Sequence, residues 1–274
     1  MERDAFLAAI ASRLGRSGPL TEAPAHLCRG VPGQYRDRMK SLNADERLQM
    51  FVNNWTALTG EAVSVPKEEA AAGIEEILAR FRQRGPLERV LYADTEELRG
   101  YGVPRVLQEQ GLSGVPWADD RDNEAELEQL GLSEPDEAGA LAGAKWQARS
   151  PLLRAAERCQ LGIVAPAAAI ANTGTLAVWS AGRQGRSVSL LPGMLLAILP
   201  AERIVARMGE AFERVNGMAN REGGLPASLN LITGPSRSAD IENDLTIGVH
   251  GPGVVGIVIL ISSGTQPRRC GLRI

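Results

Sequence analysis

The densest group of residues with possible chemistry lies in residues 232–253, which read ITGPSRSADIENDLTIGVHGPG. The GPSR corner of this segment consists of Gly234, Pro235, Ser236 and Arg237. The apolar run before the corner predicts a strand, the proline fixes a turn, and Ser236 or Ser238 can cap a helix over residues 239–245. Free backbone N–H groups at that helix start, beside Arg237, suit a phosphate, a carboxylate or the negative end of a cofactor. The corner therefore predicts an anion site.

Three acidic side chains and one histidine follow the GPSR corner and can exchange protons. On the expected helix Asp240 and Asp244 share a face, so an acid/base pair would use these two, whereas Glu242 points elsewhere. The alternative for Asp240 is stabilisation of the helix dipole in the first turn. His250 ends an apolar strand, and ligands commonly bind at the carboxyl edge of an α/β sheet, although a histidine bonded to the backbone fits the same position. The candidate catalytic residues are Asp240 and His250.

A second polar group interrupts an apolar hairpin at the NTGT corner. This corner consists of Asn172, Thr173, Gly174 and Thr175. Its amide and hydroxyl groups offer hydrogen bonds, and its glycine permits close approach of the backbone to a ligand. The alternative is a hairpin turn of type I′ or a β-bulge, which also favours Asn and Gly.

Other motifs are excluded by their context. The sequence GPGVVG at residues 251–256 matches G-x-G-x-x-G, but an apolar β-like run follows it where a dinucleotide site needs a helix. It therefore predicts a turn between two strands. Cys28, Cys159 and Cys270 form no C-x-x-C pair, which argues against a zinc or cluster site and favours three free thiols. We expect no metal and no bound cofactor.

The composition limits the class of partner. The 274 residues carry a formal net charge of −3 with a pI of about 5.6, which gives no electrostatic footprint for nucleic acid or an anionic membrane. No apolar run approaches the roughly 18 residues of a membrane span. Charged residues interrupt the first residues of the chain where a signal peptide needs an apolar core. We expect a soluble cytoplasmic protein.

Apolar periodicity divides the chain into a helical extension over residues 1–60 and an α/β domain over residues 61–274. In the extension, a short amphipathic helix at residues 4–14 is followed by a linker rich in Pro and Gly and by a longer helix at residues 48–58. Strands then alternate with helices as far as the strand SGVPW. This alternation predicts parallel βαβ units, because a parallel crossover needs a connection of helix length. The acidic segment at residues 119–144 is expected to be surface structure.

The second half of the chain has a different pattern. The closely spaced apolar runs AAAIANTGTLAVWSA, RSVSLL and MLLAILP are joined by turns containing glycine and predict antiparallel hairpins added to the sheet. A helix follows, with a buried face expected at Ile204, Val205, Met208, Phe212 and Val215. The run VVGIVILI predicts a last buried strand. Together the elements predict an α/β fold with three layers and an inserted antiparallel hairpin.

Taken together, AAIANTGTLAV, SLLPGMLLAILPAERIV and ITGPSRSADIENDLTIGVHGPG resemble the LUD domain family in its lactate utilisation protein C form. The order of the three motifs carries the resemblance, which covers roughly residues 160–261. It implies a Rossmann-like sheet with an inserted hairpin, similar to CoA transferases and ribose-phosphate isomerase. It also implies a role in a system of several proteins that oxidises L-lactate to pyruvate, with iron–sulfur subunits as partners.

The resemblance assigns both corners to motifs of the family. The matching residues are Thr173, Gly174 and Thr175 in the first motif, and Gly234, Pro235, Ser236, Arg237, Asp240, Glu242, Gly248, His250 and Gly251 in the second. One position departs from the family pattern: Asn172 stands where the family usually has Glu before T-G-T. Because an amide cannot act as a carboxylate base or nucleophile, a mechanism of the CoA-transferase kind is disfavoured.

Three functions remain open from the sequence. The leading expectation is a subunit or accessory protein of cytoplasmic L-lactate oxidation that binds a small anionic or phosphorylated ligand between the two corners. The expected ligand-binding residues are the four of the NTGT corner, the four of the GPSR corner, Asp240 and His250. The alternative is a stand-alone enzyme on a phosphorylated or CoA-linked small molecule, with Asp240 or His250 as acid/base. The third is an assembly module without a ligand.

Overall fold

The computed structural model describes residues 3–19, 39–117, 151–222, 224–239 and 245–262. The chain divides into two compact units, Met1–Ser41 and Leu42–Ile274. The first unit contains the expected amphipathic helix as α1 (Arg3–Arg13). The division falls after Ser41 rather than after residue 60, so the helix expected around residues 48–58 belongs to the α/β unit. The acidic segment at residues 119–144 lies outside the described residues.

A six-stranded sheet forms the centre of the second unit, and every pair of neighbouring strands in it is parallel. In spatial order the strands are β1 (Glu61–Pro66), β12 (Val254–Ile261), β7 (Met194–Pro200), β4 (Leu161–Val164), β2 (Arg89–Ala93) and β3 (Ser113–Trp117). The expectation of parallel units is confirmed. The expectation that MLLAILP forms an antiparallel hairpin is wrong, because this run is the central strand β7. Its uninterrupted apolar sequence is what burial on both faces of a parallel sheet requires.

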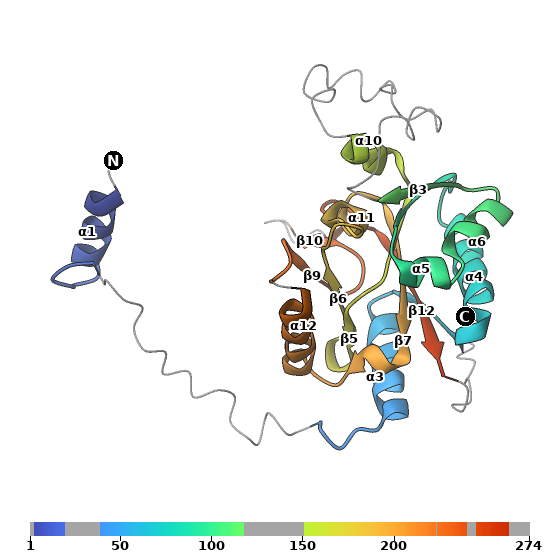
Figure 1. Cartoon of the computed structure of the whole chain (residues 1–274), viewed down its shortest axis with the longest axis horizontal. Helices are drawn as coiled ribbons and strands as arrows, with labels where there is room; N and C mark the ends of the chain where they lie inside the picture. The colour runs from blue at the N-terminus through green and yellow to red at the C-terminus, as the bar shows by residue number, and fades with distance from the viewer. Residues whose placement is uncertain (1–2, 20–38, 118–150, 223, 240–244, 263–274) are drawn as a thin grey trace. The chain divides into compact units, whose positions relative to one another are not determined.

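Helices cover both faces of this sheet (Figure 1). On one face, Val90, Leu196 and Val258 pack with the buried side of α4 (Ala70–Arg82), α5 (Glu96–Gly100) and α6 (Val103–Glu109). On the other face, Leu91, Leu195 and Ile257 pack with α3 (Ala44–Ala57), α10 (Pro151–Arg158) and α11 (Arg186–Leu190). Successive residues of each strand serve opposite faces, as the β-pleat requires. The α/β fold with three layers is confirmed.

A smaller sheet lies on the α3 side of the main sheet (Figure 1). Its strands, in spatial order, are β8 (Ile204–Val205), β5 (Ala168–Ile170), β6 (Thr175–Trp179) and β9 (Leu229–Ile232). Strands β5 and β6 form the expected antiparallel hairpin, with the 3₁₀ turn η2 (Ala171–Thr173) between them. The run RSVSLL is the helix α11, not a strand, because Val188 packs into the core beneath strand β4.

The helix expected from residue 204 begins later, as α12 (Met208–Glu222). Ile204 and Val205 form strand β8 instead. The buried face of α12 carries Ala211, Val215 and Ala219, which pack on the smaller sheet, whereas Met208 and Phe212 are 39% and 43% exposed. Of the residues expected on the buried face, Val215 is buried on α12 and Ile204 is buried in β8, and the buried face of α12 is rotated around the helix axis relative to the expected one.

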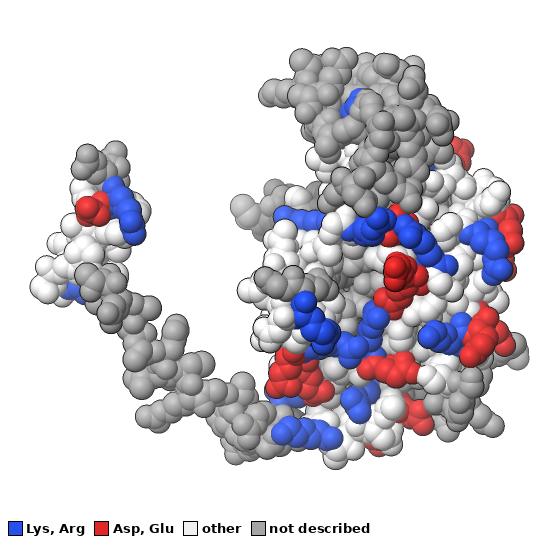
Figure 2. Space-filling view, viewed as in Figure 1, with Lys and Arg blue, Asp and Glu red and all other residues white. Residues whose placement is uncertain are grey.

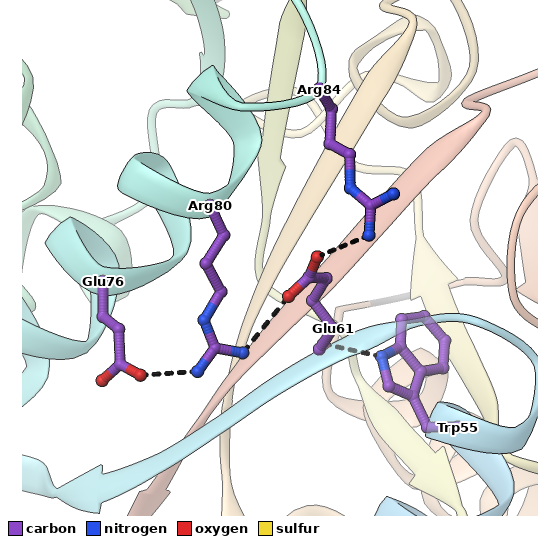
Figure 3. A network of polar contacts seen from close by, with 5 residues as sticks. All are labelled: Trp55, Glu61, Glu76, Arg80 and Arg84. Carbon is purple, nitrogen blue, oxygen red and sulfur yellow. Dashed lines mark hydrogen bonds and ion pairs between the residues drawn. The ribbon is translucent and has the colours of Figure 1, made fainter. Parts of the chain in front are cut away.

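Helix α3 is held in the α/β unit by its last turn. Its start is capped by Asn43 and Glu46, which form a reciprocal capping box. Near its end the fully buried Trp55 donates its indole N–H to the carbonyl oxygen of Glu61 across 2.9 Å. The carboxylate of Glu61 binds Arg80 at 3.2 Å and Arg84 at 3.4 Å, as Figure 3 shows. These contacts join α3, the start of β1 and α4.

None of the helices in the described part of the chain is long and apolar enough to cross a lipid bilayer.

Candidate functional site

The GPSR corner leads into a strand, and the expectation of a helix over residues 239–245 is wrong at its start. Residues Arg237–Ala239 form β10, which pairs antiparallel with β11 (Leu245–Ile247). The N–H of Ser236 is also occupied, since it donates to the carbonyl oxygen of Pro252 across 2.8 Å. The corner therefore lacks the free N–H groups of a helix start. Asp240, Glu242 and Asp244 lie outside the described residues.

Arg237 contacts the end of α3. Its guanidinium donates a hydrogen bond of 2.8 Å to the carbonyl oxygen of Leu58, the C-cap residue of that helix. Gly234 lies against the same residue: its φ is +72°, and a Cβ there would be 2.9 Å from the Cβ of Leu58. A side chain at position 234 would therefore meet both backbone strain and a clash.

The NTGT corner also packs on α3. Gly174 has a φ of +61°, and a Cβ there would lie 2.9 Å from the backbone of Asn54 and Trp55. The side-chain amide of Asn54 donates to the carbonyl oxygen of Ala171 across 2.8 Å. The NTGT corner is thus built as a close backbone contact with the helix. Asn172 itself is exposed.

A chain of hydroxyl groups joins the two corners. The Oγ1 atoms of Thr173 and Thr175 lie 2.7 Å apart, and those of Thr175 and Thr233 lie 2.8 Å apart. Thr175 is only 2% exposed, whereas Thr173 and Thr233 are exposed. Because Thr233 immediately precedes the GPSR corner, the structure brings together two motifs that lie 58 residues apart in sequence.

A hollow of about 170 Å³ lies beside the GPSR corner, and its lining includes Ser236 and His250. The lining also includes Ser189 of α11 and Val255 at the start of β12, and no residue of the NTGT corner belongs to it. The hollow is therefore at the amino edge of the main sheet. The expectation of one pocket at the carboxyl edge that includes both corners is wrong. His250 is exposed and lies three residues beyond the end of β11.

The carboxyl edge carries a different site, the arginine pocket. It has a volume of about 280 Å³, and four arginines from three parts of the fold line it: Arg183 from the turn after β6, Arg203 from the turn after β7, and Arg214 and Arg221 from α12. The rest of the lining includes Thr95, Glu97, Ala165, Ala167, Trp179, Gln184 and Met218. None of the arginines was among the residues singled out in the sequence.

The arginine pocket lies at the topological switch point of the main sheet. Thr95 follows β2, and Ala165 follows the adjacent strand β4. The chain passes from β2 to β3 on one side and from β4 to β7 on the other side. Connections that leave two adjacent parallel strands in opposite directions open a crevice at their carboxyl ends, where α/β proteins bind ligands.

The turn that carries Arg183 is fixed to the ends of both strands. Buried Gln184 donates to the carbonyl oxygens of Trp179 and Ala165 at 2.8 and 3.2 Å and accepts from the N–H of Ala165 at 2.8 Å. The guanidinium of Arg183 lies 3.0 Å from the carboxylate of Asp94. Asp94 is 1% exposed, and its two carboxylate oxygens also accept hydrogen bonds of 2.7 and 2.5 Å from the guanidinium of Arg99. Asp94 therefore positions Arg183 at the pocket wall.

Arg203 forms an ion pair with an acidic side chain. Its guanidinium lies 2.8 Å from the carboxylate of Glu97 and donates to the carbonyl oxygen of Pro166 at 3.1 Å. Glu97 also accepts from the hydroxyl of Tyr101 at 2.9 Å. Burial, and then the negative charge of Glu97, raises the pKa of Tyr101, so this phenol stays protonated.

Arg214 and Arg221 are seven residues apart on α12 and share a face of it, with Met218 between them. The ion pairs formed within the described part of the chain involve neither of the two. Burial, followed by the like charges of Arg203 and Arg221, lowers the pKa of Arg214. Figure 2 shows basic side chains gathered on this face between α12 and α5. Two arginines on one helix face that form no ion pair within the described residues suit an anion.

The described residues outside the pocket offer less chemistry. They contain no group of three His, Cys, Asp or Glu side chains arranged to hold a metal ion. Cys159 is a free thiol, 4% exposed, and burial raises its pKa to about 12, so it is a poor nucleophile. Cys28 and Cys270 lie outside the described residues.

A sequence signal for part of the pocket was present. Asp94 comes directly after strand β2 and Glu97 a few residues later, and Arg203 follows the run MLLAILP. Polar residues that follow parallel strands lie at the carboxyl edge of the sheet. Arg203 could be assigned to this edge only if MLLAILP was predicted to be a parallel strand. Arg214 and Arg221 lie at helical spacing, which is also typical of a solvated helix face.

Comparison with known proteins relates this fold to named relatives. Residues 48–260 match the family model described as LUD domain. A "Lactate utilization protein C" of Bacillus subtilis (strain 168) is 30% identical over 266 residues, which cover 95% of this chain and 96% of the relative. A protein of the same name from Shouchella clausii (strain KSM-K16) is 29% identical over 250 residues, covering 91% of this chain and 93% of the relative.

A solved structure supports the fold alone. The crystal structure of a DUF162 family protein from Deinococcus radiodurans matches with a TM-score of 0.50 and 19% sequence identity, and the match covers 80% of this chain and 99% of that one. The family model includes α3, both corners and the arginine pocket. The chain therefore belongs to the LUD domain family.

Proposed function

We propose that this chain is a subunit or accessory protein of a cytoplasmic system that oxidises L-lactate to pyruvate, and that it binds a small anion in the arginine pocket. The relatives named lactate utilization protein C match nearly the whole chain, and this name supports the pathway. Iron–sulfur proteins are the partners that we expect to transfer the electrons. The observation that supports a ligand is the pair Arg214 and Arg221, which line the pocket and form no ion pair within the described residues, while Glu97, the acid of the same lining, pairs with Arg203.

The arginine pocket is favoured over the two corners as the anion site. Arg237 donates to Leu58, and Ser236 donates its N–H to Pro252, so each of these two groups of the GPSR corner already has a partner within the protein. The hollow beside Ser236 and His250 remains a second candidate position for a ligand. The alternative ligand site consists of the residues of this hollow, the NTGT corner and Asp240.

Deletion of the gene in the native host tests the pathway. We expect the deletion strain to lose growth on L-lactate and to keep normal growth on pyruvate. A plasmid copy of the wild-type gene should restore growth. Normal growth on L-lactate in a strain that has no second copy of the gene would exclude the proposed role.

Complementation with altered genes then tests the pocket. The double variant Arg214→Ala/Arg221→Ala should restore growth poorly although it accumulates to the wild-type level. The matched control is Arg105→Ala, which removes an exposed helix arginine outside both hollows. A double variant that restores growth as well as the control would separate the pathway role from anion binding in this pocket.

A further inference from the structure

We infer that the arginine pocket selects a small molecule that carries a phosphate group over a monocarboxylate such as lactate or pyruvate. This inference rests on the proposed binding of a small anion in that pocket, and it names the chemical class of the ligand. It implies that the chain senses or holds a phosphorylated compound and does not bind the substrate of the pathway there.

The argument begins with charge. The described ion pairs give Arg203 a carboxylate of its own, from Glu97, whereas Arg214 and Arg221 take part in none. Two cations on one face of α12 are matched by a group with two negative charges. A phosphate monoester carries about −1.5 to −2 at pH 7, whereas a monocarboxylate carries one charge. A monocarboxylate would therefore leave a guanidinium without a counter-charge.

Geometry supports the same class of ligand. Guanidinium groups present fixed pairs of N–H donors, which match the oxygen atoms of a phosphate in a bidentate manner. Arginines that reach the pocket from α12 and from the turn after β6 can serve different oxygens of one tetrahedral group. A planar carboxylate has only two oxygens to offer. The size of the pocket, about 280 Å³, fits a small ester and lies at the lower end for ligand sites.

The pocket wall also offers contacts to the part of the ligand that is not phosphate. Met218 lies between the two arginines on α12, and Ala165, Ala167 and Trp179 also line the pocket. Apolar atoms beside the cations suit the carbon skeleton of a phosphate ester, whereas inorganic phosphate would leave them without a contact. An ester is therefore expected to bind more tightly than inorganic phosphate.

Binding measurements on the full chain test the inference. The probes are glycerol 3-phosphate, inorganic phosphate, L-lactate and pyruvate, compared by calorimetry at one constant ionic strength because salt screens exposed charges. We expect glycerol 3-phosphate to bind at least tenfold more tightly than either monocarboxylate. Raising the pH from 5.5 to 7.5 should strengthen its binding, since the second phosphate proton leaves near pH 6. L-Lactate keeps one charge over this range, and the described lining residues include no histidine.

Variants of the pocket arginines test whether glycerol 3-phosphate binds in the arginine pocket. Arg214→Ala and Arg221→Ala should each weaken glycerol 3-phosphate binding roughly tenfold to a hundredfold, the range for loss of a charged hydrogen bond. Arg214→Lys should lose less, because it keeps the charge, and Arg105→Ala should lose nothing. Equal or tighter binding of L-lactate or pyruvate, lost in the same variants, would overturn the inference and leave the proposed anion site intact. Binding of no probe, or binding that the variants do not change, would overturn the proposed site itself.

Discussion

The guanidinium of Arg237 donates to the carbonyl oxygen of Leu58 across 2.8 Å, although 179 residues separate the two in sequence. This bond connects strand β10 to the C-cap of α3, while Gly234 packs against the same leucine. Arg237, the arginine that stands out most in the sequence, therefore connects two elements of the fold. Its contribution to stability and its contribution to binding are separable by experiment.

Arg237→Ala is expected to lower the free energy of unfolding by about 1 kcal/mol, since an exposed hydrogen bond from a charged group is lost. Affinity for phosphate probes should stay unchanged. Urea denaturation and calorimetry measure the two quantities, with Arg105→Ala as the control. A variant of unchanged stability that has lost phosphate affinity would move the anion site to the GPSR corner.

Gly174→Ala is expected to destabilise the fold more than Gly111→Ala. Both glycines have positive φ, +61° and +66°, so both alanine variants carry the cost of the left-handed region, about 1–2 kcal/mol. At position 111 a Cβ would meet nothing within 4 Å, whereas at position 174 it would lie 2.9 Å from the backbone of α3. The clash should add at least about 1 kcal/mol. Equal losses in urea denaturation would contradict the packing of the NTGT corner on α3.

Asp94→Ala is expected to lower the free energy of unfolding by about 3 kcal/mol, the low end for removing one partner of a buried ion pair. The low end applies because the side chains of Arg99 and Arg183 are 42% and 44% exposed and can turn to water. The loosened Arg183 should also weaken phosphate binding. Glu76→Ala, which removes a carboxylate 52% exposed from its pair with Arg80, is the control and should cost at most about 0.5 kcal/mol. A loss no larger than that of the control would exclude the anchoring role.

Cys159 is expected to make stability depend on alkaline pH. Its folded pKa of about 12 lies above the unfolded value, so the folded state binds the thiol proton more tightly. The stabilisation is complete below the unfolded pKa of about 8.5 and is lost as the pH rises toward the folded pKa. Over that window the wild type should lose up to about 1.4 kcal/mol per pH unit relative to Cys159→Ala. Parallel pH curves for the two proteins in urea denaturation would show that the thiol titrates alike in both states.

Local patterns predicted α4, α6 and the parallel units well, because these two helices carry their apolar residues at helical spacing and β2 lies between them in sequence. MLLAILP shows the limit of these patterns. A short apolar run fits a hairpin or a buried parallel strand equally, and only its pairing with β12 and β4 decides. The helix expected after Ser238 failed for a related reason, since pairing of Arg237 with Ile247 outweighed the local capping signal.

The candidate site was less accessible from sequence than the fold. Arg183 reaches the pocket from a turn that Gln184 fixes to two strand ends, and Arg214 reaches it from α12, which packs on a different sheet. Their proximity depends on the tertiary arrangement of three elements, which no spacing in the sequence encodes. The two corners were visible because each combines glycine with polar residues within a few positions. The structure gives these glycines contacts with α3.

The pairing of β1 with β12 sets a condition on synthesis of the protein. Glu61 lies opposite Gly256 and Pro66 opposite Ile261, so β1 cannot pair until the much later residues of β12 have left the ribosome. Until then β1, which pairs only with β12 among the described strands, lacks that partner, and so does the β12 side of β7. The sheet can therefore close only after β12 has been synthesised, which predicts slow folding. A nascent chain stalled before Val254 would expose two open strand edges to other nascent chains, which makes it a natural client for chaperones.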